Sequence, residues 1–347
     1  MKAPRLSDLD AAGLAEVVKE AGEPAFRAKQ LRAWMWQRGV FDPREMTDLP
    51  ARLRDALIDR FPAAPLRIRE VAGADDGTAK ILFTLSDDRL VESVIIPAEK
   101  RTTICLSSQV GCGVGCLFCA SGLEGLKRNL SRGEILEQYL LSRNAARERD
   151  REPTNLVMMG MGEPMHNYEA VFEALGVINS PDGPHLGARR ITVSTSGVRK
   201  GVERFTEAKT QYTLAFSLHA PNDEIRRELV PLANAMSVDE IAEAAARYLD
   251  HTGREVTFEY VLLDGVNDAP EHADELVRRF GRVRGLFNII PWNPVDAVPF
   301  RRPSDHRIDA FVGRLERGGL KVSERRRKGS DIAAACGQLA LKKGREA

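Results

Sequence analysis

Three closely spaced cysteines are the residues with the clearest chemical potential in this sequence. Cys112, Cys116 and Cys119 form the pattern C-x3-C-x2-C within GCGVGCLFCASG. Thiolates are the usual ligands of iron–sulfur clusters, and the neighbouring glycines allow a loop to wrap closely around such a group. Three cysteines leave one iron of a 4Fe–4S cluster without a protein ligand, which is the open position that a reactive metal site needs. The spacing therefore predicts a reactive cluster.

A structural zinc site is the main alternative for this trio. Structural zinc takes four ligands, commonly from C-x2-C pairs. No fourth cysteine or histidine follows shortly after Cys119, and Cys105 lies on the preceding predicted strand. The spacing favours the cluster, and iron and sulfide analysis separates the two interpretations.

Cys105 and Cys336 complete a set of five cysteines. An odd count with a tight trio indicates a metal site with two thiols left over, rather than a set of structural disulfides. Taken alone, each remaining thiol is more often a small buried hydrophobic group than a reactive one.

Alternating elements from residue 102 onward must position these groups. Strand-like segments cover residues 103–107, 156–161, 191–196, 213–219, 256–263, 286–292 and 320–324, and helix-like segments cover residues 131–147, 168–178, 237–250, 270–280 and 305–317. This alternation predicts an α/β fold with a parallel sheet and right-handed crossovers, a partial (β/α)6 barrel. Because the chemistry of such barrels gathers at the carboxyl ends of the strands, the cysteine trio is well placed for function.

The barrel core is expected to span residues 102–325, with three shorter parts around it. Residues 1–75 form an N-terminal helical accessory domain, because apolar residues recur at helical spacing over residues 6–21 and 24–38. Residues 76–101 form a β-hairpin, and residues 326–347 form a C-terminal tail that carries Cys336.

Charge and hydropathy restrict the partners only weakly. Lys and Arg total 51 and Asp and Glu total 50, so overall charge argues neither for nor against nucleic acid. Two basic runs, residues 325–328 and the set Lys127, Arg128 and Arg132, are interpreted as solvated faces. The sequence has no run of about 18 apolar residues and starts without a signal-peptide core, which indicates a cytoplasmic protein with no membrane partner.

The N-terminal segment interleaves basic and aromatic side chains. They are Arg27, Lys29, Arg32, Trp34, Trp36 and Arg38. Such a surface suits phosphates and stacked bases, although the tryptophans equally suit a core.

Long motifs resemble the RlmN/Cfr family of radical S-adenosylmethionine RNA adenine methyltransferases. They run from FRAKQLRAWMWQRGV through ICLSSQVGC, GLKRNLS, VMMGMGEP, RRITVSTSGV, FSLHAPNDEIR, DGVNDAPEHA and NIIPWNPV to GSDIAAACGQL, and so cover nearly the whole chain. The resemblance implies a radical S-adenosylmethionine barrel that holds a 4Fe–4S cluster and uses two S-adenosylmethionine molecules per turnover. It also implies that the N-terminal domain helps bind RNA.

The resemblance implies roles for the two remaining cysteines and for one glutamate. Cys336 matches the family's methyl carrier, which becomes S-methylcysteine, and Cys105 matches the partner that resolves the RNA adduct through a transient disulfide. Glu92 matches a proton acceptor and is expected to face the barrel mouth. Gly337 is expected to give the tail freedom to approach the site.

Residues at successive strand ends match the family's S-adenosylmethionine positions. They are Gly162, Glu163, Ser194, Ser217, Leu218, His219 and Asn293. Small polar groups there would form a ring of hydrogen-bonding partners, and the carboxylate of Glu163 suits the ligand's ammonium group. Taken alone, His219 would more often be a satisfied interior histidine.

The family divides by the adenine carbon that is methylated. One branch acts on carbon 2 of an adenosine in 23S rRNA and in tRNA, and the other acts on carbon 8 of the rRNA base and confers antibiotic resistance. VMMGMGEP, SLHAPNDE and PWNP favour carbon 2, whereas NPVDAVPFRRPS departs from that pattern. The expected protein is a monomer served by a low-potential donor such as flavodoxin, and the non-enzyme alternatives are an iron–sulfur RNA-binding or redox-sensing protein and a zinc-dependent RNA-binding protein.

Overall fold

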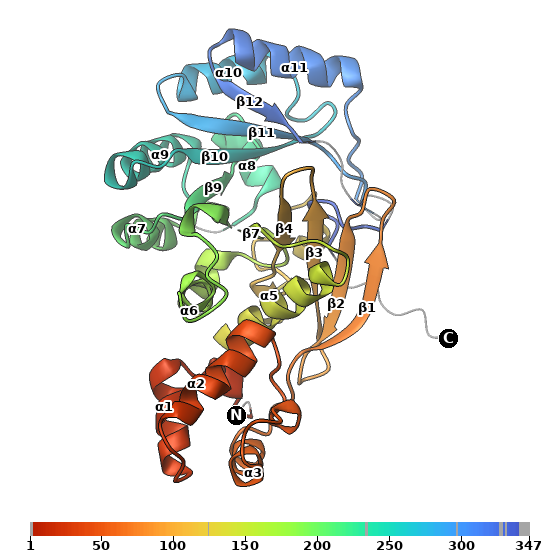
Figure 1. Ribbon diagram of the computed structural model, residues 1–347. Helices are drawn as coiled ribbons and strands as arrows, with labels where there is room; N and C mark the ends of the chain where they lie inside the picture. Colours follow the sequence, from red (N-terminus) through yellow and green to blue (C-terminus); the bar gives the residue numbers. More distant parts are fainter. Residues whose placement is uncertain are drawn as a thin grey trace.

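A computed structural model describes residues 3–123, 125–232, 235–295, 298–325, 329 and 332–339. These residues form a group of N-terminal helices beside a curved ten-stranded sheet (Figure 1). The strands are ordered β1-β2-β3-β4-β7-β8-β9-β10-β11-β12. Within the described ranges, no helix has the length and apolar character needed to cross a bilayer.

Seven strands of this sheet run parallel and confirm the predicted partial barrel. They are β4 (Thr102–Cys105), β7 (Asn155–Met158), β8 (Ile191–Thr195), β9 (Thr213–Ser217), β10 (Val256–Leu262), β11 (Gly285–Pro291) and β12 (Lys321–Glu324). The inner strands are nearly continuous apolar runs, as is typical of parallel strands with both faces covered. Their carboxyl ends meet at one edge, where polar side chains can converge.

Helices connect these strands and lie along the curved sheet (Figure 1). They are α4 (Ala120–Leu123), α5 (Arg132–Arg147), α6 (Tyr168–Asn179), α7 (Arg199–Glu207), α8 (Asp223–Leu229), α9 (Val238–Thr252), α10 (Pro270–Phe280) and α11 (Asp305–Arg317). Capping boxes begin α5 at Ser131 and α9 at Ser237, because each serine binds the backbone of a glutamate three residues later. The sequence analysis did not predict α4, α7 or α8.

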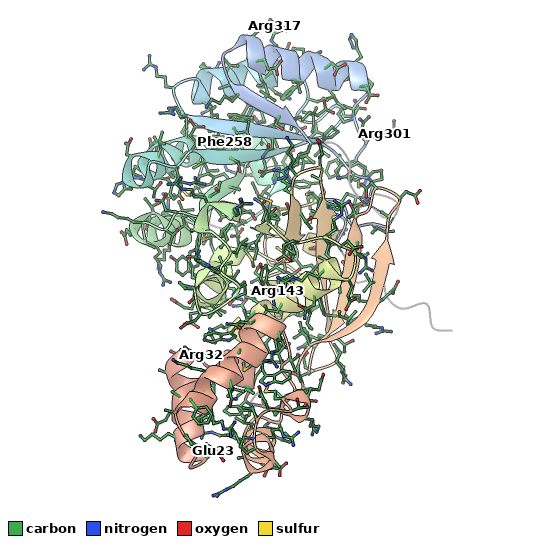
Figure 2. All side chains as sticks on the ribbon, viewed as in Figure 1. Glu23, Arg32, Arg143, Phe258, Arg301 and Arg317 are labelled. Atoms are coloured by element: carbon green, nitrogen blue, oxygen red, sulfur yellow. The ribbon has the colours of Figure 1, made fainter. Side chains whose placement is uncertain are left out.

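Aromatic rings fill the core between the later strands and α10. Phe258, labelled in Figure 2, lies 4.7 Å from Phe287 and 4.8 Å from Phe280, measured between ring centroids. All three side chains are buried. Aromatic pairs at this spacing add to the hydrophobic contribution, so they help pack β10 and β11 against α10.

The N-terminal group contains α1 (Ala11–Glu20), α2 (Phe26–Arg32), a π-helical turn over Ala33–Arg38, and α3 (Ala51–Arg60). Trp36 is buried, whereas Trp34 is partly buried with the Arg38 guanidinium 4.0 Å from its ring. One of the two predicted stacking residues therefore belongs to the core.

Buried ion pairs join this group to α5. The Glu137 carboxylate accepts from Arg5 at 3.0 Å, from the Leu66 amide at 2.6 Å, and from the Ser7 hydroxyl. Arg143, labelled at the same junction in Figure 2, donates to the carbonyl of Gln37. Removing one member of such a buried network would leave a charge uncompensated.

Three antiparallel strands extend the parallel sheet. The predicted hairpin is present as β2 (Ala79–Thr84) and β3 (Leu90–Pro97), and β3 pairs with β4. Residues Arg67–Gly73 form a further strand, β1, so the last part of the segment predicted to be helical is extended. A separate small sheet pairs β5 (Gln109–Val110) with β6 (Arg128–Asn129).

One basic run is not the solvated face that the sequence predicted. Arg132 is buried and donates to the carbonyl of Leu9 at 2.8 Å. Arg128 is held by Asp87 and Glu134 at 2.7 Å each. Among these three cations, only Lys127 is exposed.

Candidate active site

A cavity of about 140 Å³ opens at the carboxyl ends of the parallel strands. Most of the residues singled out from the sequence line it: Cys112, Cys116, Cys119, Gly162, Glu163, Ser194, Ser217, His219, Asn293 and Cys336. The loop after β4, the ends of β7 to β11 and the C-terminal tail thus contribute to a single site.

The cysteine trio lies on a tightly folded loop. Gly111 has a φ of +73°, and a Cβ there would lie 1.9 Å from the Gly125 carbonyl oxygen, so only glycine fits. The amide of Leu117 donates to the Leu229 carbonyl at 3.1 Å, which ties the loop to the end of α8. Burial raises the pKa of the Cys112 thiol to about 11 and also raises the pKa of Cys116 and Cys119. These thiols need a bound cation to ionise at neutral pH.

The donor set and its spacing fit an iron–sulfur cluster. Three thiols of one loop face the cavity, and soft thiolates are the preferred ligands of such clusters. In the part of the chain that is described, no three His, Cys, Asp or Glu side chains converge closely enough for a single metal ion. A 4Fe–4S cluster does not need its ligands so close together, because each thiolate binds a different iron.

Two polar side chains across the cavity are prepared for an organic ligand. Glu163, after β7, accepts from the amides of Met165 at 3.0 Å and Ser196 at 2.7 Å, which holds its carboxylate in place. Burial raises the pKa of this carboxyl. The Oδ1 atom of Asn293, after β11, is buried without a hydrogen-bond partner among the described residues. A buried acceptor of this kind points to a missing donor, which the ammonium or hydroxyl groups of S-adenosylmethionine would supply.

Cys336 reaches the same cavity from the tail. Its Sγ accepts from Nη1 of Arg325 at 3.5 Å, and its carbonyl accepts from Nδ2 of Asn293 at 3.2 Å. Gly337 has a φ of +83°, and its carbonyl accepts from the Ala120 amide on the cysteine loop at 2.8 Å. The glycine therefore supports a fixed left-handed turn that brings the tail to the cluster loop.

Cys105 is the last residue of β4 and does not line the cavity. It is buried, and burial together with the nearby Cys336 raises the pKa of its thiol to about 12, whereas the Arg325 charge acts in the opposite direction. Arg325 is thus hydrogen-bonded to Cys336, and its charge also acts on the Cys105 thiol.

Comparisons with known proteins identify the family. Residues 106–277 match the model of the Radical SAM superfamily, and residues 5–61 match the Ribosomal RNA large subunit methyltransferase N-terminal domain. A dual-specificity RNA methyltransferase RlmN of Rhodopirellula baltica is 45% identical over 95% of this chain and 89% of that protein. The chain belongs to the RlmN family.

Other RlmN relatives and a solved structure agree. An RlmN of Bacillus cereus is 41% identical over 100% of this chain and 96% of that protein. The crystal structure of a radical SAM methyltransferase from Sphaerobacter thermophilus superposes with a TM-score of 0.93 at 45% identity, covering 96% of this chain and 98% of that one. As a radical S-adenosylmethionine enzyme of the RlmN family, the protein uses a 4Fe–4S cluster and S-adenosylmethionine.

Two charged cavity residues of this RlmN-family chain were not found by sequence reasoning. Arg325 follows β12 and belongs to the basic run of residues 325–328, which was interpreted as a solvated face. Its guanidinium group instead donates to Cys336 and lies 3.5 Å from the carboxylate of Glu259. Glu259 is buried on β10 and accepts from Asn288 at 2.8 Å. The sequence signal that could have identified Arg325 as a site residue is its position directly after a strand. The other members of this basic run, residues 326–328, lie outside the described ranges.

Besides Cys105, two predicted residues do not line the cavity. Leu218 is buried, and its amide donates to the Glu259 carbonyl at 3.0 Å. Glu92 is buried on β3 and pairs with Lys80 at 3.0 Å, and Lys80 also reaches the Ala333 carbonyl at 3.4 Å. Glu92 is thus linked to the tail through Lys80, and its role as proton acceptor stays a prediction.

His219 is held as a neutral ring. Its φ is +58°, and its Nδ1 accepts from the Val261 amide at 3.1 Å, which requires that nitrogen to be unprotonated. Burial, with a smaller contribution from Arg226, lowers the pKa of His219 from 6.5 to about 3.

Stability is expected to fall with acidity because of this histidine. Between pH 6.5 and about 3, the unfolded chain binds a proton at His219 that the folded chain refuses, so stability is highest above this window. His219→Asn keeps a residue that tolerates positive φ and removes the titration. The quantity of interest is the free energy of unfolding of the original protein minus that of the variant. As the pH is lowered below 6, this difference should fall by up to about 1.4 kcal/mol per pH unit. Denaturant titrations from pH 7.5 to 4.5 measure this difference, and a constant difference would contradict the prediction.

Proposed function

We propose that this enzyme methylates carbon 2 of an adenosine in 23S rRNA and in tRNA. The observation that carries the proposal is that the Cys336 thiol shares one cavity with the three cluster cysteines. A methyl carrier has to meet S-adenosylmethionine, the RNA base and the resolving thiol in turn. Family membership supports RNA as the substrate.

Carbon 2 of adenine requires radical chemistry. It lies between two ring nitrogens and is electron-poor, so it does not attack an electrophilic methyl group. The bound cluster and S-adenosylmethionine supply a hydrogen-abstracting organic radical. The residues proposed to hold the cluster are Cys112, Cys116 and Cys119. Those proposed to hold S-adenosylmethionine all line the cavity: Gly162, Glu163, Ser194, Ser217, His219 and Asn293.

The two spare thiols divide the methyl transfer between them. The Cys336 sulfur would take a methyl group from S-adenosylmethionine by displacement, and loss of one hydrogen atom from that methyl group would let its carbon bond to carbon 2 of the base. The adduct would then lose one electron, which the cluster would accept, and Glu92 would take the proton from carbon 2. The Cys105 thiolate would attack the Cys336 sulfur and break the carbon–sulfur bond, so that the carbon left on RNA takes a proton and a Cys105–Cys336 disulfide remains. Arg325 stabilises the negative charge on the Cys336 thiolate, because it donates a hydrogen bond to that sulfur.

The partners follow from this chemistry. A base that reacts in a buried cavity must leave its stack, at a cost of a few kcal/mol, and RNA loops make this cheapest. In this proposal the accessory domain of residues 1–75 binds RNA, and the hairpin of residues 76–101 lies at the entrance of the site. Residues 102–325 form the radical core, and residues 326–347 form the tail that carries the methyl group. The enzyme acts as a monomer. It works in the cytoplasm, where ribosomal RNA and a low-potential donor such as flavodoxin are found.

Product analysis tests the proposal. The anaerobically reconstituted protein is incubated with S-adenosylmethionine, a reductant and a 23S rRNA fragment, and the nucleosides are identified by mass spectrometry. We expect 2-methyladenosine from the rRNA fragment and also from tRNA, the second substrate. The Cys116→Ala variant should lose most of its bound iron and form no product. The appearance of 8-methyladenosine would place the enzyme in the carbon-8 branch. No methylated base from a protein with an intact cluster would refute the substrate.

A further inference from the structure

A buried carboxylate on β10 lines the cavity with its two oxygens in different environments. The Oε1 atom of Glu259 accepts from Nδ2 of Asn288 at 2.8 Å and from the hydroxyl of Thr257 at 3.1 Å. The Oε2 atom is buried and accepts no hydrogen bond from the described residues. Two donors on one oxygen hold the carboxylate in a fixed orientation, so the second oxygen is presented to a charged neighbour.

Arg325 is the charged neighbour of that second oxygen. Its Nη2 atom lies 3.5 Å from Oε2 of Glu259, the one ion pair that Arg325 makes within the described part of the chain. Its guanidinium group also contacts two sulfur atoms, Sγ of Cys336 at 3.5 Å and Sδ of Met159 at 3.9 Å. Because sulfur is a weak acceptor, these two contacts alone would hold the guanidinium group loosely. The carboxylate of Glu259 therefore determines where this cation lies.

Burial decreases along this series of contacts. The side chain of Glu259 is 5% exposed, that of Arg325 is 35% exposed, and Cys336 is exposed in a turn of the tail. On β10, Glu259 pairs in register with Ser217 of β9 and Asn288 of β11. The next strand in the sheet is β12, which Arg325 follows (Figure 1). A rigid interior group thus orients a more exposed cation, which in turn contacts the thiol.

Stability alone does not explain a carboxylate at this position. Desolvation of a buried ion pair offsets the attraction between its charges, so such a pair is weak evidence of stabilisation. Val261, two positions along β10, lines the same cavity with an apolar side chain. A hydrocarbon would therefore suit this face of the strand as well. A charged group retained in a cavity beside a reactive thiol indicates a function.

We propose that Glu259 is a positioning residue that holds Arg325 against the Cys336 sulfur. The proposal rests on the proposed function, in which this sulfur accepts a methyl group. In that step a bond forms between the Cys336 sulfur and the methyl carbon, and the bond from that carbon to the sulfonium sulfur breaks. S-Adenosylhomocysteine leaves, and the thiol proton passes to solvent. A cation beside the sulfur favours the thiolate, which is the nucleophilic form, and Glu259 keeps that cation in place.

A double-mutant cycle tests whether Glu259 acts through Arg325. The variants are Glu259→Gln, Arg325→Gln and the two combined, each as the anaerobically reconstituted holoenzyme. Cys336 is alkylated with iodoacetamide at neutral pH without S-adenosylmethionine, and the labelled tail peptide is quantified by mass spectrometry. Because the thiol is already exposed, access does not limit this small reagent. We expect each single variant to react at least about fivefold more slowly, and the double variant to match Arg325→Gln within about twofold.

A conservative variant separates the charge of Glu259 from its packing. Glu259→Asp keeps the charge on a shorter side chain, whereas Glu259→Gln keeps the length and an oxygen for Asn288. A charge role predicts faster alkylation in the Asp variant than in the Gln variant, and a purely structural role predicts the reverse order. If the Gln variant fails to fold, the Asp variant replaces it in the cycle.

The matched control removes a carboxylate at the opposite end of the same two strands. Glu255 directly precedes β10 and pairs with Lys321 at the start of β12, at 3.1 Å. Glu255→Gln should therefore alkylate at the original rate and keep its iron. Methyl transfer from S-adenosylmethionine to Cys336, measured on the same peptide, should fall in the same order across the Glu259 and Arg325 variants. The affinity for S-adenosylmethionine should stay within about twofold.

Three results would overturn the proposal. The first is an unchanged alkylation rate in Glu259→Gln. The second is an equal loss when Glu259→Gln is added to Arg325→Gln, because Glu259 would then act without Arg325. The third is a loss of affinity for S-adenosylmethionine with normal alkylation, which would make Glu259 a ligand contact. If the original protein takes no methyl group on Cys336, the proposed function fails, and the alkylation cycle still decides the role of Glu259.

Discussion

Replacing Cys336 by alanine is expected to abolish RNA methylation while the cluster is retained. The substitution removes only the sulfur, which accepts from Arg325. The variant keeps the two hydrogen bonds that dock the tail. The Asn293 side-chain amide still donates to the Cys336 carbonyl, and the Ala120 main-chain amide still donates to the Gly337 carbonyl. Because the thiol is exposed, we expect the change in stability to be within about 0.5 kcal/mol. Methyl transfer to RNA and iron content, measured on one preparation, test the prediction.

A second tail variant separates loss of the thiol from loss of docking. The Gln338 side chain donates to the Pro294 carbonyl at 2.8 Å, so Gln338→Ala weakens docking and leaves the thiol. We expect this control to methylate RNA more slowly but measurably. Normal product yield from Cys336→Ala, or complete inactivity of Gln338→Ala with an intact cluster, would argue that the tail acts by its position rather than by its sulfur.

Replacing Cys105 by alanine is expected to trap RNA covalently on the protein. Without the resolving thiol, the carbon bridge between Cys336 and the base has no partner for thiol exchange. Cys105 is buried on β4, where its main chain pairs with Val94 and Val157, so alanine preserves the strand at a cost of about 1 kcal/mol. A denaturing gel should show a slower protein band that disappears after nuclease treatment.

Two further variants make this result specific. Val94→Ala, on the residue paired with Cys105, removes a larger volume from the neighbouring position but keeps the thiol, and should release its product normally. The double variant Cys105→Ala with Cys336→Ala should give no slow band. If the slow band is absent from Cys105→Ala although S-adenosylmethionine is cleaved, another group resolves the adduct.

Local patterns explain which parts of the fold could be predicted. Strand and helix periodicities identified the parallel strands and most of the helices between them, because burial of a repeating face is a property of neighbouring residues. The strand Arg67–Gly73 was missed because most of its side chains are exposed, so its sequence lacks an apolar alternation. It exists because β2 offers a free edge for pairing. Arg132 was misjudged for a similar reason, since its burial depends on carbonyls of the distant N-terminal segment.

The sequence by itself determined the metal chemistry and the family. The three cluster cysteines lie within eight positions, and short spacing on one loop is enough to predict that they act together. Only the tertiary structure decided which distant groups meet them. Cys336 and Arg325 come from the end of the chain, and hydrogen bonds from Asn293 and Ala120 hold the tail at the cavity where the strands end. Glu92 illustrates the difference, because its buried pairing with Lys80 depends on how β2 and β3 align. Contacts between residues far apart in the chain depend on packing, and no local pattern encodes them.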